Sequence, residues 1–188
     1  MAGKVWHPLF ARRNVQLGIK VKCFSISVDD NYVPPSPLGW WGVIDRKTLE
    51  RKKRSQMQKH MLFQVESHMQ MVFTDIIMFP CFLVSELVMN VIKKYDQFIN
   101  FERIILYDKS KKKSMIYYLP FLNKIELRKR STHVKENVLA ISREELGEYI
   151  IMETIYDDKT YIVMRIDLVE SMLRRGVIGI GLKEIIVN

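Results

Sequence analysis

Two carboxylates in the sequence have a spacing that could support metal-dependent chemistry. Asp108 ends a segment typical of a β-strand, and a later predicted strand carries the triplet Glu126-Leu127-Arg128. Nucleases of the restriction type place an aspartate beside a glutamate-x-lysine, so that the carboxylates hold Mg²⁺ and the cation acts at the scissile phosphate. Here arginine stands in place of lysine, and Asp108 opens a lysine-rich turn in which a turn role is natural. A Mg²⁺-dependent nuclease is therefore kept only as an alternative function.

The other residues that could bind metals or act as nucleophiles form no such pattern. Neither cysteine belongs to a Cys-x-x-Cys pair, and the sequence has neither a Gly-x-Ser-x-Gly motif nor a phosphate-binding loop. The four histidines lack the spacing of a zinc site: His7, His60, His68 and His133. We expect a binding protein rather than an enzyme, with no metal and no cofactor.

Basic residues are the second feature that could carry function, because the formal net charge is +9. Residues 46–59 hold seven basic side chains and one acidic one, and residues 101–135 hold ten basic and three acidic. Residues 137–188 hold six basic against nine acidic. Basic blocks attract phosphates, so a nucleic-acid-binding protein using 46–59 and 109–130 is another alternative. The blocks lack interleaved aromatic residues for base stacking, which favours a solvated helix face and a lysine-rich turn.

Length and composition indicate what kind of protein holds these residues. The chain has 188 residues, 48% of them hydrophobic and 27% charged, which is enough for a substantial core and excludes a disordered protein. Two cysteines favour a reducing compartment, and no signal peptide is apparent. The most apolar stretch, 76–87, is far shorter than the ~20 residues of a membrane span. We expect a cytoplasmic protein without membrane contact.

Hydrophobic patterning predicts an α+β fold, with a mainly antiparallel sheet and a few short helices. Residues 1–188 are expected to form a single domain, in which 1–73 are less regular than 74–188. Turns are predicted at 29–31, 108–114 and 157–158. The predicted strands are 4–10, 19–27, 60–65, 101–107, 115–119, 123–128, 137–141, 149–152, 160–164 and 182–187.

Capping residues predict where the helices begin and end. One helix should run from Ser85 to about Tyr95. The lysine- and arginine-rich segment 45–58 is expected to form a surface helix or a partly ordered linker. Two serine-or-aspartate positions are followed three residues later by glutamate, the spacing of a capping box. The predicted caps are Ser85, Ser142, Glu145, Asp167, Glu170 and Gly176.

Several exposed positions could form a binding face. Trp40 and Trp41 stand between glycines and either cap the core or make an external contact. Arg174 and Arg175 either meet the C-terminal end of a helix or project toward a partner. The candidate binding face consists of Trp40, Trp41, Lys111, Lys112, Lys113, Arg174 and Arg175.

Residues 74–187 resemble a family of small bacterial proteins. The segments that carry the resemblance are Thr74-Asp75-Ile76-Ile77, the run 79–86, Ile116-Tyr117-Tyr118-Leu119-Pro120 and the run 161–180, with a looser match at Trp40-Trp41-Gly42. The family is grouped with the immunity proteins of polymorphic toxin systems and was formerly a domain of unknown function. The resemblance implies a cytoplasmic protein that binds and neutralises a cognate toxin, often by covering its active site, and it carries no catalytic residues.

The charge constrains which toxin could be the partner. Electrostatic complementarity governs the encounter rate and the specificity of a protein complex. Nuclease toxins that bind phosphate backbones are often basic, which suits a chain of net charge +9 poorly. We expect a toxin with a neutral or acidic surface, or else contact through the acidic residues of 137–188.

Overall fold

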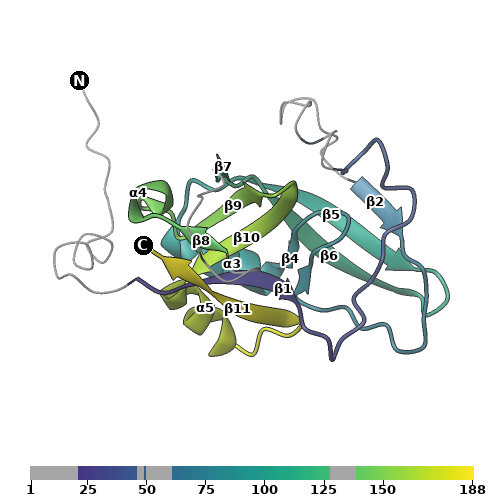
Figure 1. The fold of residues 1–188 in the computed structure, drawn as a ribbon. Coiled ribbons are helices and arrows are strands. Elements are labelled where there is room, and N and C mark those ends of the chain that lie inside the picture. Colours follow the sequence, from purple (N-terminus) through teal and green to yellow (C-terminus); the bar gives the residue numbers. More distant parts are fainter. Residues whose placement is uncertain (1–20, 46–48, 50–60, 128–138) are drawn as a thin grey trace, which may run out of the picture.

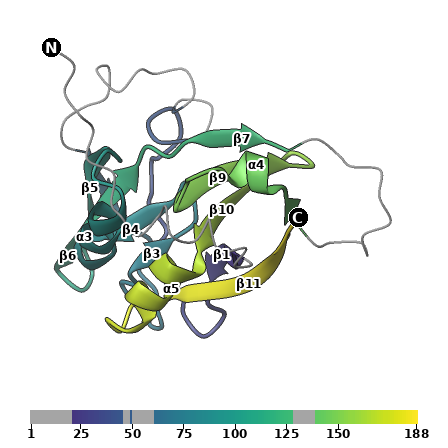
Figure 2. The ribbon, with the colours of Figure 1, turned by 90° about the vertical axis from the view of Figure 1, so that its left-hand side faces the viewer.

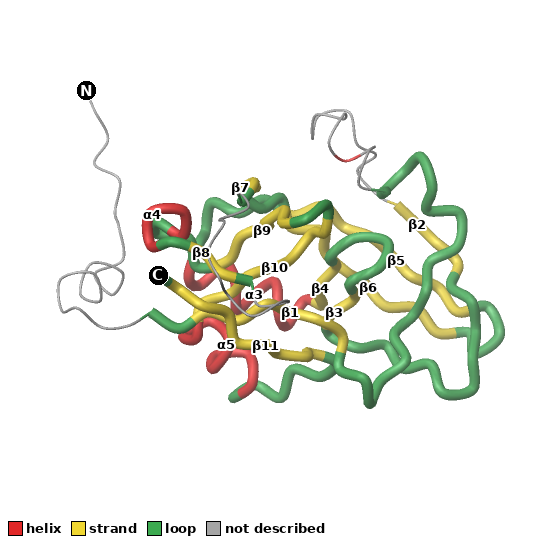
Figure 3. The backbone as a smooth tube through the Cα atoms, viewed as in Figure 1, coloured by secondary structure: helices red, strands yellow, loops and turns green. Residues whose placement is uncertain are grey.

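The chain folds into two β-sheets with helices gathered at one end (Figures 1 and 3). The structure is a computed structural model and describes residues 21–45, 49, 61–127 and 139–188. The predicted strand 4–10, nearly all of the predicted helix within 45–58 and Arg128 lie outside the described residues. No helix in the described part of the chain is long and apolar enough to cross a membrane.

The first sheet has six strands in the order β7-β9-β10-β1-β11-β8. Figure 2 shows β7, β9, β10, β1 and β11 following one another across it. β1 lies in the middle, where it pairs antiparallel with both β10 and β11. The strands are β1 (Cys23–Val28), β7 (Lys124–Glu126), β8 (Ala140–Ile141), β9 (Ile151–Tyr156), β10 (Lys159–Arg165) and β11 (Ile180–Val187).

The second sheet has five strands in the order β2-β5-β6-β4-β3. Its centre is the long β5–β6 hairpin, paired from Phe101 opposite Pro120 to Asp108 opposite Lys113. β2 extends the sheet on one side, and the short β3–β4 hairpin on the other. The strands are β2 (Met61–Gln64), β3 (Ile76–Ile77), β4 (Leu83–Ser85), β5 (Phe101–Asp108) and β6 (Lys113–Pro120).

The α+β class is confirmed, but the prediction of a mainly antiparallel sheet is wrong because both sheets are mixed. Parallel pairs join β7 to β9, β8 to β11 and β2 to β5. Each of these pairs places a strand at a sheet edge, and its partner is distant in the sequence. Short turns enforce antiparallel neighbours, whereas a strand that returns after a long connection can dock in either direction. Hydrophobic alternation along one strand does not report that direction.

Helix α3 (Glu86–Tyr95) begins where its sequence predicts. Ser85 is the N-cap residue, and its hydroxyl accepts a hydrogen bond from the N–H of Val88 at 3.4 Å. Val88, Val91 and Ile92 are buried and form the apolar face of the helix that packs into the core. The short helix α4 (Arg143–Leu146) has the predicted capping box, in which Ser142 and Glu145 satisfy each other's backbone N–H groups.

Helix α5 (Ile166–Leu173) begins earlier than predicted, so the expected capping box of Asp167 and Glu170 is wrong. The N-cap position is Arg165, which makes no side-chain capping bond, and Asp167 lies within the first turn. The Arg165 guanidinium holds the Asp167 carboxylate at 2.7 Å, so this aspartate serves an ion pair. At the other end the helix finishes at Leu173 with Arg174 as its C-cap residue, and Gly176, with a φ of +71°, belongs to the turn that follows.

One core cluster joins both sheets to the helices. It combines Ile26 of β1, Ile162 of β10 and Val84 of β4 with the buried faces of α3 and α5. The phenol of Tyr95, the last residue of α3, donates to the main-chain carbonyl of Asp167 in α5 at 3.0 Å. The two sheets therefore share this cluster, while a second cluster lies on the five-stranded sheet and a third on the six-stranded sheet.

Candidate functional site

The structure does not bring the two proposed nuclease carboxylates onto neighbouring strands. Asp108 ends β5 in the five-stranded sheet, whereas Glu126 lies on β7 at an edge of the six-stranded sheet. Glu126 is exposed and Asp108 is fully buried. Among the described residues no group of three or more histidine, cysteine or acidic side chains could hold a metal ion.

Asp108 instead organises the turn between β5 and β6. Its carboxylate accepts hydrogen bonds from the N–H groups of Ser110 and Lys111, at 2.9 and 3.0 Å, and from the hydroxyl of Ser67 at 3.0 Å. The Lys111 N–H is the largest cause that holds the pKa of Asp108 below its usual value, with the Ser67 and Ser110 bonds acting the same way. This carboxylate is a structural acceptor that stays ionised.

The lysines of this turn have different surroundings. The ammonium group of Lys111 donates to the main-chain carbonyls of His68 and Met71, at 2.8 and 3.2 Å. It therefore connects the β5–β6 turn to the loop between β2 and β3. Lys112 and Lys113 are exposed, and Lys112 has a φ of +50° at the tip of the turn.

The two predicted arginines bond within their own helix. Arg174 lies 3.3 Å from the Glu170 carboxylate, one helical turn away. Arg175 donates to both the carbonyl and the hydroxyl of Ser171 at 2.6 Å. α5 lies toward one end of the fold and the β5–β6 turn lies at the other (Figure 1). The seven predicted residues therefore do not form one face.

The two adjacent tryptophans have different environments. Trp40 packs against the cluster of buried residues that includes Ile44 and Leu83. Trp41 points outward with 72% of its surface exposed. One indole is therefore partly buried against the core, and its neighbour lies at the surface.

Phe79 completes this aromatic feature and was missed in the sequence. Its ring meets Trp40 edge-to-face at 5.1 Å, and Trp40 meets Trp41 in the same manner at 5.4 Å. Phe79 is 57% exposed because it lies in the turn between β3 and β4. Residues 74–84 are an apolar run that Pro80 and Cys81 interrupt, and Pro80 is the signal for a turn there. We call Trp41 and Phe79, with Trp40 between them, the aromatic surface.

The backbone around the tryptophans is fixed on both sides. Gly39 and Gly42 have φ values of +67° and +74°, which the left-handed region allows readily only to glycine. The Gly42 N–H donates to the buried Asp45 carboxylate at 2.6 Å, and the N–H groups of Val43 and Ile44 both donate to the carbonyl of Trp40. A hydrogen-bonded turn therefore presents the exposed indole.

Comparison with known proteins does not assign the chain to a family. A scan against models of protein families gives no match, and neither does a search of curated proteins. The resemblance to immunity proteins stays a prediction.

Proposed function

We propose that the protein is an immunity-type binding protein that neutralises a cognate bacterial toxin by covering part of its surface. The observation that carries the proposal is the aromatic surface, where Trp41 and Phe79 are 72% and 57% exposed on two neighbouring turns. Exposed apolar groups of this kind mark interaction sites, and tryptophan is among the residues that most often dominate binding energy. The resemblance carried by residues 74–187 supplies the class of partner.

The charge of the chain narrows the choice of toxin. A net charge of +9 disfavours long-range attraction to a basic nuclease, so the toxin surface is neutral or acidic. Neutralisation takes place in the cytoplasm, without a cofactor and without catalysis by this chain.

The test uses the toxin domains encoded beside the gene, titrated with the full-length protein by calorimetry. Trp41→Ala should weaken the complex by about 30-fold or more, as expected for a hot-spot residue. Phe98→Ala is the matched control, because Phe98 is also a highly exposed aromatic, at 69%, but follows α3 instead of belonging to the aromatic surface. Its affinity should equal that of the unmodified protein.

Two results would contradict the proposal. Equal losses from Trp41→Ala and Phe98→Ala would remove the aromatic surface as the contact, and failure to protect cells from any neighbouring toxin would remove the immunity role. A gel shift with mixed DNA and RNA at two salt concentrations tests the nucleic-acid alternative. Binding that weakens steeply as salt rises would favour that alternative instead.

A further inference from the structure

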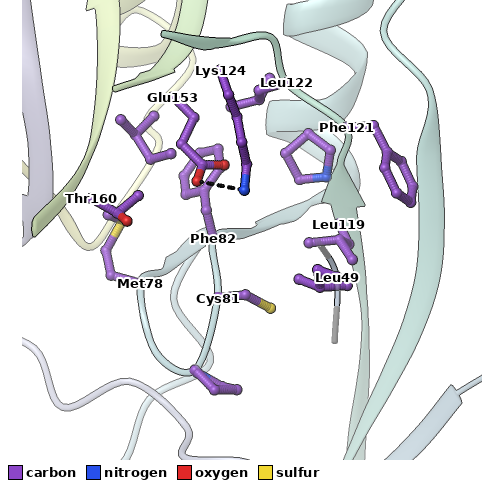
Figure 4. Close-up of a pocket in the computed structure, with 13 residues that line it drawn as sticks. Leu49, Met78, Cys81, Phe82, Leu119, Phe121, Leu122, Lys124, Glu153 and Thr160 are labelled. Atoms are coloured by element: carbon purple, nitrogen blue, oxygen red, sulfur yellow. Dashed lines mark ion pairs between the residues drawn. The ribbon is translucent and has the colours of Figure 1, made fainter. Parts of the chain in front are cut away.

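A pocket of about 200 Å³ lies between the two sheets, distinct from the aromatic surface (Figure 4). Phe82 and Leu119 line it from the five-stranded side, and Ile162 lines it from β10 of the six-stranded sheet. Met78 and the segment Pro120-Phe121-Leu122 add further apolar surface. Most of the wall is therefore hydrophobic, which is typical of sites that bind small molecules.

The charged residues among those described as lining the pocket form one ion pair. Lys124 of β7 and Glu153 of β9 are directly opposite in the parallel ladder, with the ammonium nitrogen 3.2 Å from a carboxylate oxygen. Figure 4 shows both side chains reaching over the pocket, with Thr160 nearby. The Glu153 side chain is only 18% exposed, so the pair is partly withdrawn from water.

A thiol also faces this space. Figure 4 shows the sulfur of Cys81 directed into the pocket, below the ion pair. Burial, and to a smaller extent the charge of Glu153, raise the pKa of Cys81 to about 12. The thiol is therefore neutral near pH 7 and adds apolar surface to the pocket.

Size and charge together define the ligand that would fit. An apolar cavity of about 150 Å³ accommodates benzene, so a pocket of about 200 Å³ takes one ring with a short substituent. The ammonium and carboxylate already neutralise each other, so a charged ligand would lose its hydration without gaining a counter-ion. A group that both donates and accepts hydrogen bonds can meet both members of the pair.

We propose that the inter-sheet pocket binds an uncharged amphiphile with a single ring or a short branched chain. Its apolar body contacts Phe82, Leu119 and Ile162. Its hydroxyl or amide head group donates to Glu153 and accepts from Lys124.

Three probes of matched shape test on the full-length protein whether the pocket prefers an uncharged ligand. They are 2-phenylethanol, phenylacetate and phenethylamine, each titrated by ligand-observed NMR. We expect saturable binding of 2-phenylethanol, and binding of both ions about tenfold weaker or less, because a buried charge lacks a counter-ion. No saturable binding of 2-phenylethanol, or equal binding of all three probes, would overturn the proposal.

A charge-removing variant locates the site. Glu153→Gln leaves the ammonium of Lys124 without this carboxylate. The ratio of the affinity for phenylacetate to that for 2-phenylethanol should therefore rise by about tenfold or more. Glu184→Gln is the matched control, because it breaks the exposed pair between Lys22 and Glu184 elsewhere on the sheet. The control should keep the preference for 2-phenylethanol, and the same shift in both variants would place binding outside the pocket.

The second variant fills the pocket. Cys81→Leu places additional carbon atoms where the thiol now points, and should abolish binding of 2-phenylethanol. Chemical-shift spectra of the free variant establish that it is folded. Unchanged binding by a folded Cys81→Leu protein would contradict the assignment of the pocket.

Discussion

Asp108 shows how a residue that suggests catalysis can serve structure instead. The catalytic interpretation required an accessible carboxylate near a second acid, and the structure places Asp108 in a buried position with three hydrogen-bond donors around it. Two of the donors are main-chain N–H groups of the turn that it begins. Such bonds stabilise the ionised form, so folding and ionisation of this group are coupled.

The coupling predicts that Asp108→Asn lowers the free energy of unfolding by an amount that depends on pH. The folded-state pKa lies below the ordinary value of 3.8, so the stabilisation is present above that value and is lost as pH falls through the folded pKa. The variant should be less stable than the parent at pH 7, and the gap should narrow below about pH 3.8. Urea unfolding followed from pH 7 to pH 2 measures both effects.

The control for this experiment is Asp30→Asn, which removes an exposed carboxylate from the turn after β1. Its stability should follow that of the parent protein to within about 0.5 kcal/mol at pH 7. A gap for Asp108→Asn that stays constant down to pH 2 would show that ionisation of Asp108 does not contribute.

At the scale of elements, the N-terminal end of α3 is held by more than its cap. The Ser85 hydroxyl donates to the Asp75 carboxylate at 2.6 Å while it accepts from Val88. The same carboxylate accepts from the N–H of Ile178, in the loop before β11, at 2.9 Å. A single aspartate therefore connects the start of α3 to a segment about a hundred residues later.

Ser85→Ala should lower the free energy of unfolding by more than the removal of an ordinary N-cap side chain does. Loss of an N-cap oxygen typically costs ~1 kcal/mol, and here the partly buried Asp75 carboxylate also loses a donor. We expect a loss of about 2 kcal/mol in the free energy of unfolding by urea. Ser114→Ala is the control, because Ser114 is exposed on β6. A loss no larger than that of the control would contradict the role of Ser85.

The sequence predicts some elements better than others. The difference depends on how far apart in the sequence the residues lie that stabilise each element. α3 and the β5–β6 hairpin depend on signals within a few residues, namely the Ser85 cap and the turn at 108–114. α5 already begins at Ile166, and Asp167 pairs with Arg165, a contact that the capping pattern does not show. The parallel edge strands and the Asp75 connection depend on contacts across the whole chain.

The candidate site was predictable to a similar extent. The two adjacent indoles between glycines could be identified as a candidate contact from the sequence. Which of the two faces solvent depends on the packing of Trp40 against the core, which the sequence does not show. Phe79 could not be predicted, because it is the β3–β4 turn that places its ring centroid 5.1 Å from that of Trp40. Lys111 and the two arginines are exposed and also donate to acceptors within the chain, contacts that the sequence pattern did not indicate.

At the scale of the whole molecule, the boundary drawn at residue 73 does not separate two packing units. β1 belongs to residues 1–73 and lies between β10 and β11 of residues 74–188. The second core cluster likewise combines residues from both sides of the boundary. Its contributors from residues 1–73 are Ile44, Met61, Phe63, Val65 and Met71.

A fragment of residues 74–188 should therefore fail to fold on its own. Without β1, strands β10 and β11 lose their shared neighbour, and apolar side chains of the five-stranded sheet become exposed. Thermal unfolding followed by circular dichroism should show no cooperative transition for this fragment. Co-expression with residues 1–73 should restore the transition, whereas an isolated fragment that unfolds at the temperature of the full chain would contradict this expectation.

The central position of β1 also sets an order of events during synthesis on the ribosome. β1 ends at Val28, but its two sheet partners begin only at Lys159 and Ile180. The β5–β6 hairpin has both strands available as soon as residue 120 has left the exit tunnel, whereas the six-stranded sheet is complete only after residue 187 has emerged. The emerging chain thus carries β1 as an unpaired strand until the segment from Lys159 onward appears, at the stage when open strand edges attract other chains.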